Sequence, residues 1–297
     1  MTISAFQQTI LSWYKTNRRD LPWRNTKDPY RILVSEVMLQ QTQVARVIPK
    51  YKEFLKAFPT LESLAKASDK KLLKTWAGLG YWRRALNLKE AAKQLVSHDV
   101  KNLRSWKFYT VPEQLDKLPG IGPYTAHALA CFAFGSTEAF LDTNIRRVYL
   151  HFFFPRKKNV PDKEILTIAQ AALASIPSSS NGTRYGVKIN PREWHYALFD
   201  YGATVLKNNK ANRRSKHYAK QSKFEGSFRS YRTKVVNFLL SQKQNRASQK
   251  TIEALLKESP YPKEKIITSL LKDRLIKQSP PASQARALRA GPTHYSL

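Results

Sequence analysis

Two acidic residues stand in settings where a carboxyl group could do chemistry. Glu36 shares a predicted helix with Gln40 and Gln43, which follow it at helical spacing away from the apolar stripe, and Gln41 lies beside them. A carboxyl group among amides could protonate a base while the amides hydrogen-bond to nucleobase edges; a solvated polar face is the alternative. Asp142 is predicted to begin another helix, beside a basic turn. Both acids are therefore candidate catalytic residues.

The sequence between these acids predicts a helix-hairpin-helix. The stretch Leu118-Pro-Gly-Ile-Gly-Pro-Tyr-Thr-Ala126 has apolar residues at helical spacing on both sides, and Gly135 marks the end of the second helix. Gly120 and Gly122 allow positive φ and leave backbone N–H groups uncovered where the second helix begins with its positive dipole. Such a turn can hold a phosphate, although an ordinary corner between two helices also uses glycine. A phosphate-binding turn followed at fixed distance by Asp142 indicates chemistry on a nucleic acid.

Further predicted helices must position these groups. Asp28 and Pro29 form a helix start, and the helix is predicted to run to Pro49. Residues 51–95 have a helical pattern that is interrupted by Gly78-Leu-Gly-Tyr-Trp-Arg-Arg84. Aromatic side chains beside arginines on a flexible turn can wedge into a base stack; a helix cap with a core tryptophan is the alternative.

The composition indicates which kind of partner the protein binds and in which part of the cell it works. The 297 residues include 52 Lys and Arg against 21 Asp and Glu, a net charge of +31 that favours a nucleic acid over a membrane as partner. The single cysteine, Cys131, excludes disulfides within the chain and a cysteine-built metal site. Because no signal peptide or long apolar run is evident, we expect an intracellular protein, cytoplasmic and associated with the nucleoid if the source is prokaryotic.

The C-terminal third differs in character from the rest. Residues 1–206 form the predicted catalytic domain, and residues 207–234 carry ten Lys or Arg and one acid, Glu225. This basic run is predicted to be an extended arm lying against phosphates, or disordered without them. Residues 235–278 predict a small winged-helix-like appendage or, equally, a three-helix packing element. Residues 279–297 are predicted to be disordered.

The motifs together resemble a known family. Leu21-Pro-Trp-Arg24, Val34-Ser-Glu-Val-Met-Leu-Gln-Gln-Thr-Gln43, Gly78-Leu-Gly-Tyr81, the hairpin and Leu141-Asp-Thr-Asn144 occur in one chain in this order. The sequence resembles the helix-hairpin-helix DNA glycosylases, and most closely the adenine DNA glycosylases of the MutY type. The resemblance covers roughly residues 6–206, and the glutamate with its double glutamine is its most specific part.

The resemblance implies an all-α fold with two lobes and DNA held in the cleft between them. In that family the residue matching Glu36 protonates N7 of a flipped-out adenine, and the residue matching Asp142 stabilises the positive sugar as the glycosidic bond breaks. Asn144 would assist Asp142. Since neutral adenine is a poor leaving group, the two acids must hold opposite protonation states, and we expect a raised pKa for Glu36 and an ionised Asp142.

Tyr124 distinguishes reaction types within this resemblance. Bifunctional relatives such as endonuclease III carry a lysine at this position, whose amine attacks the sugar and leads to strand cleavage. A tyrosine cannot form a Schiff base, so we expect a monofunctional enzyme that leaves an abasic site. Thymine glycosylases of T/G mismatches share the tyrosine, so it does not separate them from adenine glycosylases.

Other residues are assigned to DNA by the same resemblance. Arg19, Arg24 and Tyr196 would line the base pocket, although family members often carry Glu or Gln where this chain has Tyr196. Gln40, Gln41 and Tyr81 would contact or wedge beside the opposite base, which is 8-oxoguanine or guanine in the family. The full set expected to bind DNA is Gln40, Gln41, Tyr81, Leu118, Gly120, Ile121, Gly122, Arg213 and Arg214.

Two departures from the family pattern affect cofactors and specificity. The four cysteines of the family's iron–sulfur cluster are absent, so we expect no cluster and no metal, with the basic run 207–234 keeping the DNA contact. The resemblance leaves room for a monovalent cation held by hairpin carbonyls. The C-terminal region is also too short for the Nudix-like domain that reads 8-oxoguanine, so discrimination between 8-oxoguanine and guanine is expected to be weaker.

These observations lead to one function and two alternatives. We expect a monomeric, monofunctional glycosylase that removes adenine opposite 8-oxoguanine or guanine from double-stranded DNA. A thymine or uracil glycosylase for T/G and U/G mismatches is the first alternative; Glu36 argues against it, because thymine leaves as an anion without protonation at N7. A non-catalytic lesion-binding protein is the second, and the presence of both Glu36 and Asp142 argues against it.

Overall fold

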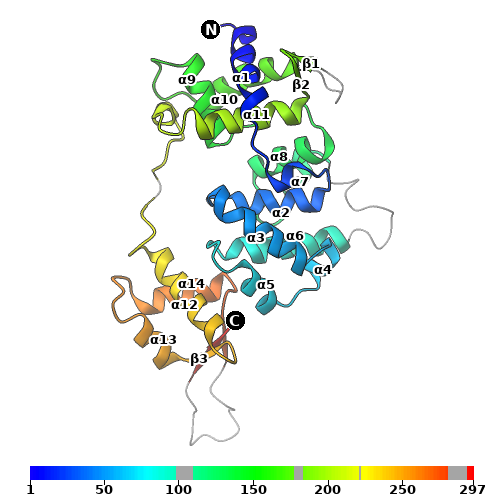
Figure 1. The fold of residues 1–297 in the computed structure, drawn as a ribbon. Coiled ribbons are helices and arrows are strands. Elements are labelled where there is room, and N and C mark those ends of the chain that lie inside the picture. Colours follow the sequence, from blue (N-terminus) through cyan, green and yellow to red (C-terminus); the bar gives the residue numbers. More distant parts are fainter. Residues whose placement is uncertain (98–109, 177–182, 221, 280–292) are drawn as a thin grey trace, which may run out of the picture. The chain divides into compact units, whose positions relative to one another are not determined.

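The structure is a computed structural model that describes residues 1–97, 110–176, 183–220, 222–279 and 293–297 (Figure 1). The chain divides into two compact units. Unit 1 comprises Met1–Gln40 and His98–Lys220, and unit 2 comprises Gln41–Ser97 and Gln221–Leu297. The predicted boundaries at residues 206 and 234 therefore differ from the observed ones, because residues 41–97 belong to the same unit as the C-terminal region.

The described residues of unit 1 form helices and one short hairpin. Its elements are α1 (Ile3–Asn17), η1 (Pro22–Arg24), α2 (Pro29–Leu39), α7 (Pro112–Leu115), α8 (Pro123–Phe134), α9 (Thr143–Phe153), α10 (Asp162–Ala174), β1 (Thr183–Arg184), β2 (Val187–Lys188), α11 (Pro191–Thr204) and η4 (Ala211–Arg214). Phe6 of α1 packs on the rings of Tyr149 and Trp194, with centroids 5.2 and 5.7 Å apart. This aromatic core holds α1, α9 and α11 together, while α2 packs against α8.

The predicted helix from Pro29 to Pro49 is broken in the structure. Helix α2 ends at Leu39, and α3 begins only at Val44 and then contains Pro49. Between them lie four polar residues, 40–43, and Gln41 adopts a left-handed backbone with φ of 55°. These residues have no apolar side chain to bury against the core, so continuing the helix would gain little packing energy. As a result, Glu36 and Gln43 do not share a helix.

Unit 2 combines helices from two distant parts of the sequence with a small sheet. Its elements are α3 (Val44–Ala57), α4 (Leu61–Ala65), α5 (Asp69–Trp76), α6 (Arg83–Ser97), α12 (Phe228–Ser241), β3 (Arg246–Ser248), α13 (Gln249–Leu255), α14 (Lys263–Lys272), β4 (Lys277–Ser279) and β5 (His294–Ser296). Phe54 packs against Phe58 and Trp76, with ring centroids 4.9 and 5.9 Å apart. Leu72 and Leu88 are buried in the same unit.

The C-terminal region has the order helix, strand, helix, helix, strand, strand, which is the winged-helix-like alternative of the two predicted. Strand β5 lies between β3 and β4 and is antiparallel to both, with Tyr295 opposite Ala247 and Gln278. The prediction of a disordered tail was wrong for Ser279 and residues 294–296, because buried Tyr295 anchors the last strand. Residues 280–292 of that tail lie outside the described residues.

The predicted basic arm, 207–234, is partly helical. It contains η4, and α12 begins at Phe228 with the Ser227 side chain accepting a hydrogen bond from the Ser230 backbone. The extended interpretation was therefore wrong from Phe228 onward, because Ser227 caps a helix whose later residues Val235 and Val236 are buried. None of the described helices is long and apolar enough to span a membrane.

Candidate active site

Glu36 is a buried acid on a helix that packs inside unit 1. Asp28 caps α2 by accepting a hydrogen bond from Tyr30 N at 2.9 Å, and Pro29 occupies the first turn, as the sequence predicted. Only 4% of the Glu36 surface is exposed. Burial raises the pKa of Glu36 to about 7, although a hydrogen bond from Tyr124 opposes the rise. A carboxyl group with this pKa can hold a proton near neutrality.

The hairpin brings Tyr124 to this acid. Tyr124 is the second residue of α8, and its hydroxyl donates to Glu36 Oε2 at 3.1 Å. Gly120 has φ of 75°, as expected, but Gly122 has φ of −95° and an added Cβ there would meet no atom within 4 Å. The sequence allows positive φ at both glycines, and the structure has it at Gly120, which is the position in this turn that needs glycine for its backbone.

The side chain of Gln40 ties the end of α2 to the hairpin. Its Nε2 donates to Thr125 Oγ1 at 3.1 Å and to the Gly120 carbonyl at 3.3 Å. Gln40 therefore supports the position of the hairpin relative to Glu36. The Leu118 carbonyl accepts a backbone bond from Ile121 at 3.1 Å, so two of the hairpin carbonyls already have protein donors. A monovalent cation at these carbonyls stays a prediction.

Asp142 is the N-cap of α9. Its carboxylate accepts from Asn144 N at 2.9 Å, from Ile145 N at 2.6 Å and from Asn144 Nδ2 at 2.9 Å. Burial raises the pKa of Asp142, and these donated bonds oppose the rise by stabilising the charged form. The expectation of an ionised Asp142 thus has three hydrogen bonds in its favour and burial against it.

Asn144 is held between Asp142 and an arginine. Its Oδ1 accepts from Arg147 Nη1 at 3.1 Å, and the same Nη1 donates to the Gly202 carbonyl at 2.7 Å. Gly202 of α11 was missed by the sequence analysis: a Cβ there would lie 2.5 Å from the Asn144 carbonyl oxygen. A glycine inside the buried pattern of residues 194–206 was the available signal for this close helix contact.

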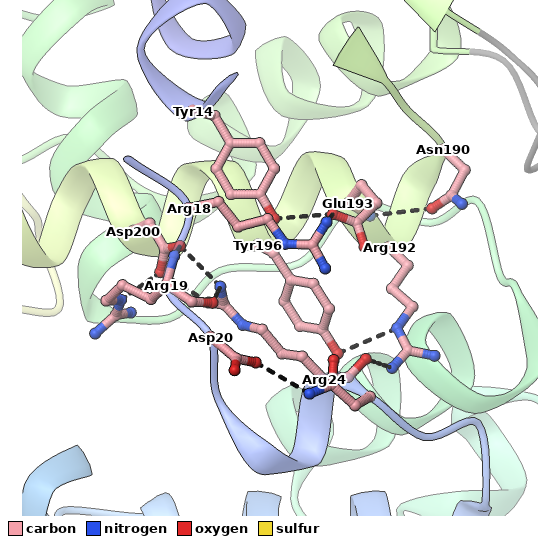
Figure 2. A network of polar contacts seen from close by, with 11 residues as sticks. Tyr14, Arg18, Arg19, Asp20, Arg24, Asn190, Arg192, Glu193, Tyr196 and Asp200 are labelled. Carbon is pink, nitrogen blue, oxygen red and sulfur yellow. Dashed lines mark hydrogen bonds and ion pairs between the residues drawn. The ribbon is translucent and has the colours of Figure 1, made fainter. Parts of the chain in front are cut away.

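Arg19 and Arg24 converge on a buried acid that the sequence analysis also missed, Asp200 (Figure 2). Arg24 donates two bonds to the Asp200 carboxylate, at 2.7 and 2.8 Å, and Arg19 Nε donates one at 2.5 Å. The Asp200 side chain is fully buried. The available signal was a lone aspartate in the apolar pattern of α11, a residue type that is rarely buried unless paired.

Tyr196, another residue of the predicted base pocket, contacts Arg24 and Arg192. The Arg24 guanidinium lies 4.3 Å from the centroid of the Tyr196 ring, and Arg192 Nε donates to the Tyr196 hydroxyl at 3.2 Å (Figure 2). Burial raises the pKa of Tyr196, and the charge of Glu36 raises it further. The charge of Arg24 lowers the pKa of Glu36. These mutual effects place the catalytic candidates and the pocket candidates in one electrostatic environment.

The comparisons with known proteins agree with this geometry. Residues 34–172 match the family model of the HhH-GPD superfamily base excision DNA repair protein. The adenine DNA glycosylase of Mycolicibacterium smegmatis is 31% identical over 302 residues, which cover 94% of each chain. The chain belongs to the HhH-GPD superfamily of base excision DNA repair proteins. The family resemblance seen in the sequence is therefore confirmed.

Other relatives of this HhH-GPD protein cover less of it. The adenine DNA glycosylase of Buchnera aphidicola (subspecies Baizongia pistaciae) is 37% identical over 211 residues, or 70% of this chain. That match spans only 55% of the Buchnera protein, so this chain corresponds to about half of that relative's length. Among solved structures, a thermostable thymine-DNA glycosylase matches with a TM-score of 0.58 and 26% identity, covering 73% of this chain and 96% of that one.

The remaining residues that the sequence analysis assigned to DNA differ in their exposure and in their hydrogen-bond partners. The side chains of Leu118 and Ile121 are 2% and 4% exposed, so these two residues can offer DNA their main chain only. Arg213 is exposed, as a DNA contact requires. Arg214 instead donates to the Leu150 and Pro155 carbonyls, at 2.8 and 3.1 Å. Its guanidinium therefore satisfies carbonyl groups at the end of α9, and its assignment to DNA stays a prediction.

We expect Asp200→Asn to destabilise the protein by about 3–5 kcal/mol, because two guanidinium groups would lose their buried counter-charge. Urea unfolding measures the loss. Glu164→Gln is the matched control in the same unit: Glu164 pairs with Lys157 at 2.6 Å on the surface, and losing that pair should cost less than about 1 kcal/mol. Equal, small losses in the two variants would contradict the structural role assigned to Asp200.

Proposed function

We propose that this HhH-GPD protein is a monofunctional DNA glycosylase that hydrolyses the N-glycosidic bond of adenine mispaired with 8-oxoguanine or guanine. The observation that carries the proposal is Glu36: a buried carboxyl group whose pKa is raised to about 7, bonded to Tyr124 and close enough to Asp142 for their charges to interact. The names of the relatives, adenine DNA glycosylase, support the same substrate.

The two acids would divide the reaction between them. Glu36 gives its proton to N7 of the flipped-out adenine, and the electron pair of the bond between the sugar and N9 leaves with the base. The sugar becomes positively charged, and the Asp142 carboxylate offsets that charge. Water then adds to the anomeric carbon and releases a proton, which restores the acid form of Glu36. Adenine and an abasic site are the products.

Tyr124 supports the absence of strand cleavage. Burial raises the pKa of its phenol well above the usual value, and the charge of Glu36 raises it further, so the hydroxyl stays protonated. A phenol also has no amine to form a Schiff base with the sugar. The enzyme would therefore leave an intact strand that breaks only after alkali treatment.

A thymine or uracil glycosylase for T/G and U/G mismatches is the second candidate, favoured by the structural similarity to a thymine-DNA glycosylase. A protonated Glu36 argues for adenine, because thymine leaves as an anion and has no N7 to protonate. A protein that binds lesions without catalysis, the third candidate, would not need two acids in different environments.

We further propose that the protein works as a monomer on double-stranded DNA, without a cofactor, in the cytoplasm near the nucleoid if it is prokaryotic. The residues present do not fit the family's iron–sulfur cluster. Such a cluster needs several cysteine thiolates, whereas the sequence has one cysteine. That residue, Cys131, is buried in α8, and burial raises the pKa of its thiol to about 12.

A base-release assay under single-turnover conditions tests the proposal. Duplexes would carry A opposite 8-oxoguanine, A opposite guanine, T opposite guanine or U opposite guanine, and each product would be analysed with and without alkali. The proposal predicts free adenine from the first two duplexes and strand breaks only after alkali. Release of thymine or uracil instead would transfer the function to the mismatch alternative, and breaks without alkali would contradict the monofunctional assignment.

A further inference from the structure

The three-stranded sheet of unit 2 has a core face and an outer face. Tyr295 of β5 is paired with Ala247 of β3, and both side chains are buried. Because successive side chains of a strand point to opposite faces, the residues on either side of Tyr295 and Ala247 point away from this core. The residues that share this other side, which we call the outer face, are Arg246, Ser248, Lys277, Ser279, His294 and Ser296.

The outer face carries positive charge and hydrogen-bond donors. Arg246, Ser296 and Lys277 lie in one row across the three strands, and the row beside it consists of Ser248, His294 and Ser279. Arg246 and Lys277 are exposed, and none of the six side chains is acidic. Within the part of the chain that the structure describes, neither Arg246 nor Lys277 has a side-chain hydrogen bond or ion pair. Both cations can therefore bind a ligand without losing a contact in the protein.

Buried contacts determine where this face lies. Asn245, just before β3, has φ of 52°, and its Nδ2 donates to the carbonyl of Leu239 on α12 at 3.0 Å. The Leu297 N–H donates to the Asn245 carbonyl at 3.3 Å, so the turn into β3 is bonded to both α12 and the end of β5. The sheet thus holds the backbones of Arg246 and Lys277 two strand spacings apart, or about 10 Å.

The composition of the outer face favours a polyanion over a folded protein as its partner. The centres of protein interfaces are rich in aromatic and other apolar side chains, and none of the six residues is apolar. Arg, Lys and Ser are common donors to the phosphate oxygens of DNA. With a repeat of roughly 3.4 Å per phosphate along the duplex axis, a separation of about 10 Å spans about three phosphates of one strand.

The charge of the surrounding region has the same sign. Residues 222–279 include 13 Lys or Arg and five Asp or Glu. One of the five acids, Asp273, is already paired with Arg83, at 3.1 Å, and with Arg232. A positive excess of this kind raises the local concentration of a polyanion at the surface.

We propose that the outer face is a second DNA-binding surface, which holds the sugar-phosphate backbone of duplex DNA and contacts no base. The proposal rests on the proposed action on DNA and goes beyond it, since no residue of this sheet belongs to the catalytic site or the base pocket. Arg246 and Lys277 supply the charge, and the serine hydroxyls donate to phosphate oxygens. Such contacts position a protein on the duplex and carry no sequence information, so undamaged DNA is held as well as damaged DNA.

The salt dependence of binding to undamaged DNA tests this proposal. The probe is a fully paired duplex with a fluorescent label, and anisotropy gives the Kd over a series of salt concentrations. Each phosphate contact contributes about 0.9 to the slope of log Kd against the logarithm of the salt concentration. Arg246→Gln combined with Lys277→Gln should therefore weaken binding and lower this slope by about 1.8.

Two control variants separate the surface from net charge and from folding. Lys257→Gln combined with Lys265→Gln also removes two exposed charges from this region, but from the turn after α13 and from α14, and should leave the slope unchanged. Arg246→Lys combined with Lys277→Arg keeps both charges and should keep the slope. If the neutral double variant has a lower Tm, the single variants Arg246→Gln and Lys277→Gln decide, each with an expected loss of about 0.9.

Two results would overturn the proposal. One is an unchanged slope in folded neutral variants of Arg246 and Lys277. The other is an equal fall of the slope in the variant of Lys257 and Lys265, which would show that net charge alone matters. Neither result depends on adenine release. A protein that releases no adenine but shows the expected slopes would therefore reject the proposed reaction and leave this surface standing.

Discussion

Glu36→Gln is expected to slow adenine release by about 10²–10⁴-fold, the usual contribution of a general acid. The amide keeps the shape of the side chain and can still accept the hydrogen bond that Tyr124 donates to Oε2. It cannot deliver a proton to N7. Single-turnover release from a duplex with A opposite guanine measures the effect, and anisotropy should show that the variant still binds this duplex.

The pH dependence of the rate is the control for this prediction. Because burial raises the pKa of Glu36 to about 7, the acid form is complete well below pH 7 and is lost as the pH rises through that value. The wild-type rate constant should therefore fall about tenfold per unit above pH 7. Tyr124→Phe removes a bond that lowers this pKa, so the fall should begin at higher pH. A wild-type rate that increases above pH 7 would contradict the role of Glu36 as an acid.

Asp142→Asn is expected to reduce the rate of adenine release by about 10²–10³-fold, because the developing positive sugar would lose its nearest carboxylate. Helix α9 should remain intact, since asparagine is as good an N-cap as aspartate and its carbonyl can accept from the Asn144 and Ile145 backbones. The measurement is the single-turnover rate constant together with urea unfolding.

A matched variant separates this effect from a general loss of negative charge. Glu164 in the same unit pairs with Lys157 at 2.6 Å on the surface. Glu164→Gln should therefore leave the rate of adenine release within about threefold of the wild-type value, since surface pairs contribute little. Undiminished activity in Asp142→Asn would show that the assigned mechanism is wrong.

Local signals in the sequence predicted the elements that hold the catalytic candidates. Asp28 with Pro29 marks the start of α2, Gly135 takes the left-handed conformation that ends α8, and Asp142 caps α9. Each of these signals depends on residues within one helical turn. The spacing rules placed Glu36 away from the apolar stripe and did not predict that it is buried, so its burial and its bond to Tyr124 come from the structure.

Features that depend on distant contacts could not be predicted in the same way. The pairing of Asp200 with Arg19 and Arg24 joins residues more than 170 positions apart, and no local pattern encodes it. The last strand, His294–Ser296, is too short to predict by itself and exists through its pairing with β3 and β4. The break at residues 40–43 was missed because helical spacing continues through it, although the polar run offers no apolar face.

Excision of 7-deazaadenine tests the central claim, proton transfer from Glu36 to N7, most directly. This base keeps the shape and pairing edge of adenine but carries a C–H group in place of N7. Single-turnover release would be compared for adenine and 7-deazaadenine, each opposite guanine in the same duplex, after anisotropy has shown that both duplexes bind. The account predicts release of adenine and no detectable release of 7-deazaadenine. Similar rates for the two bases would contradict it.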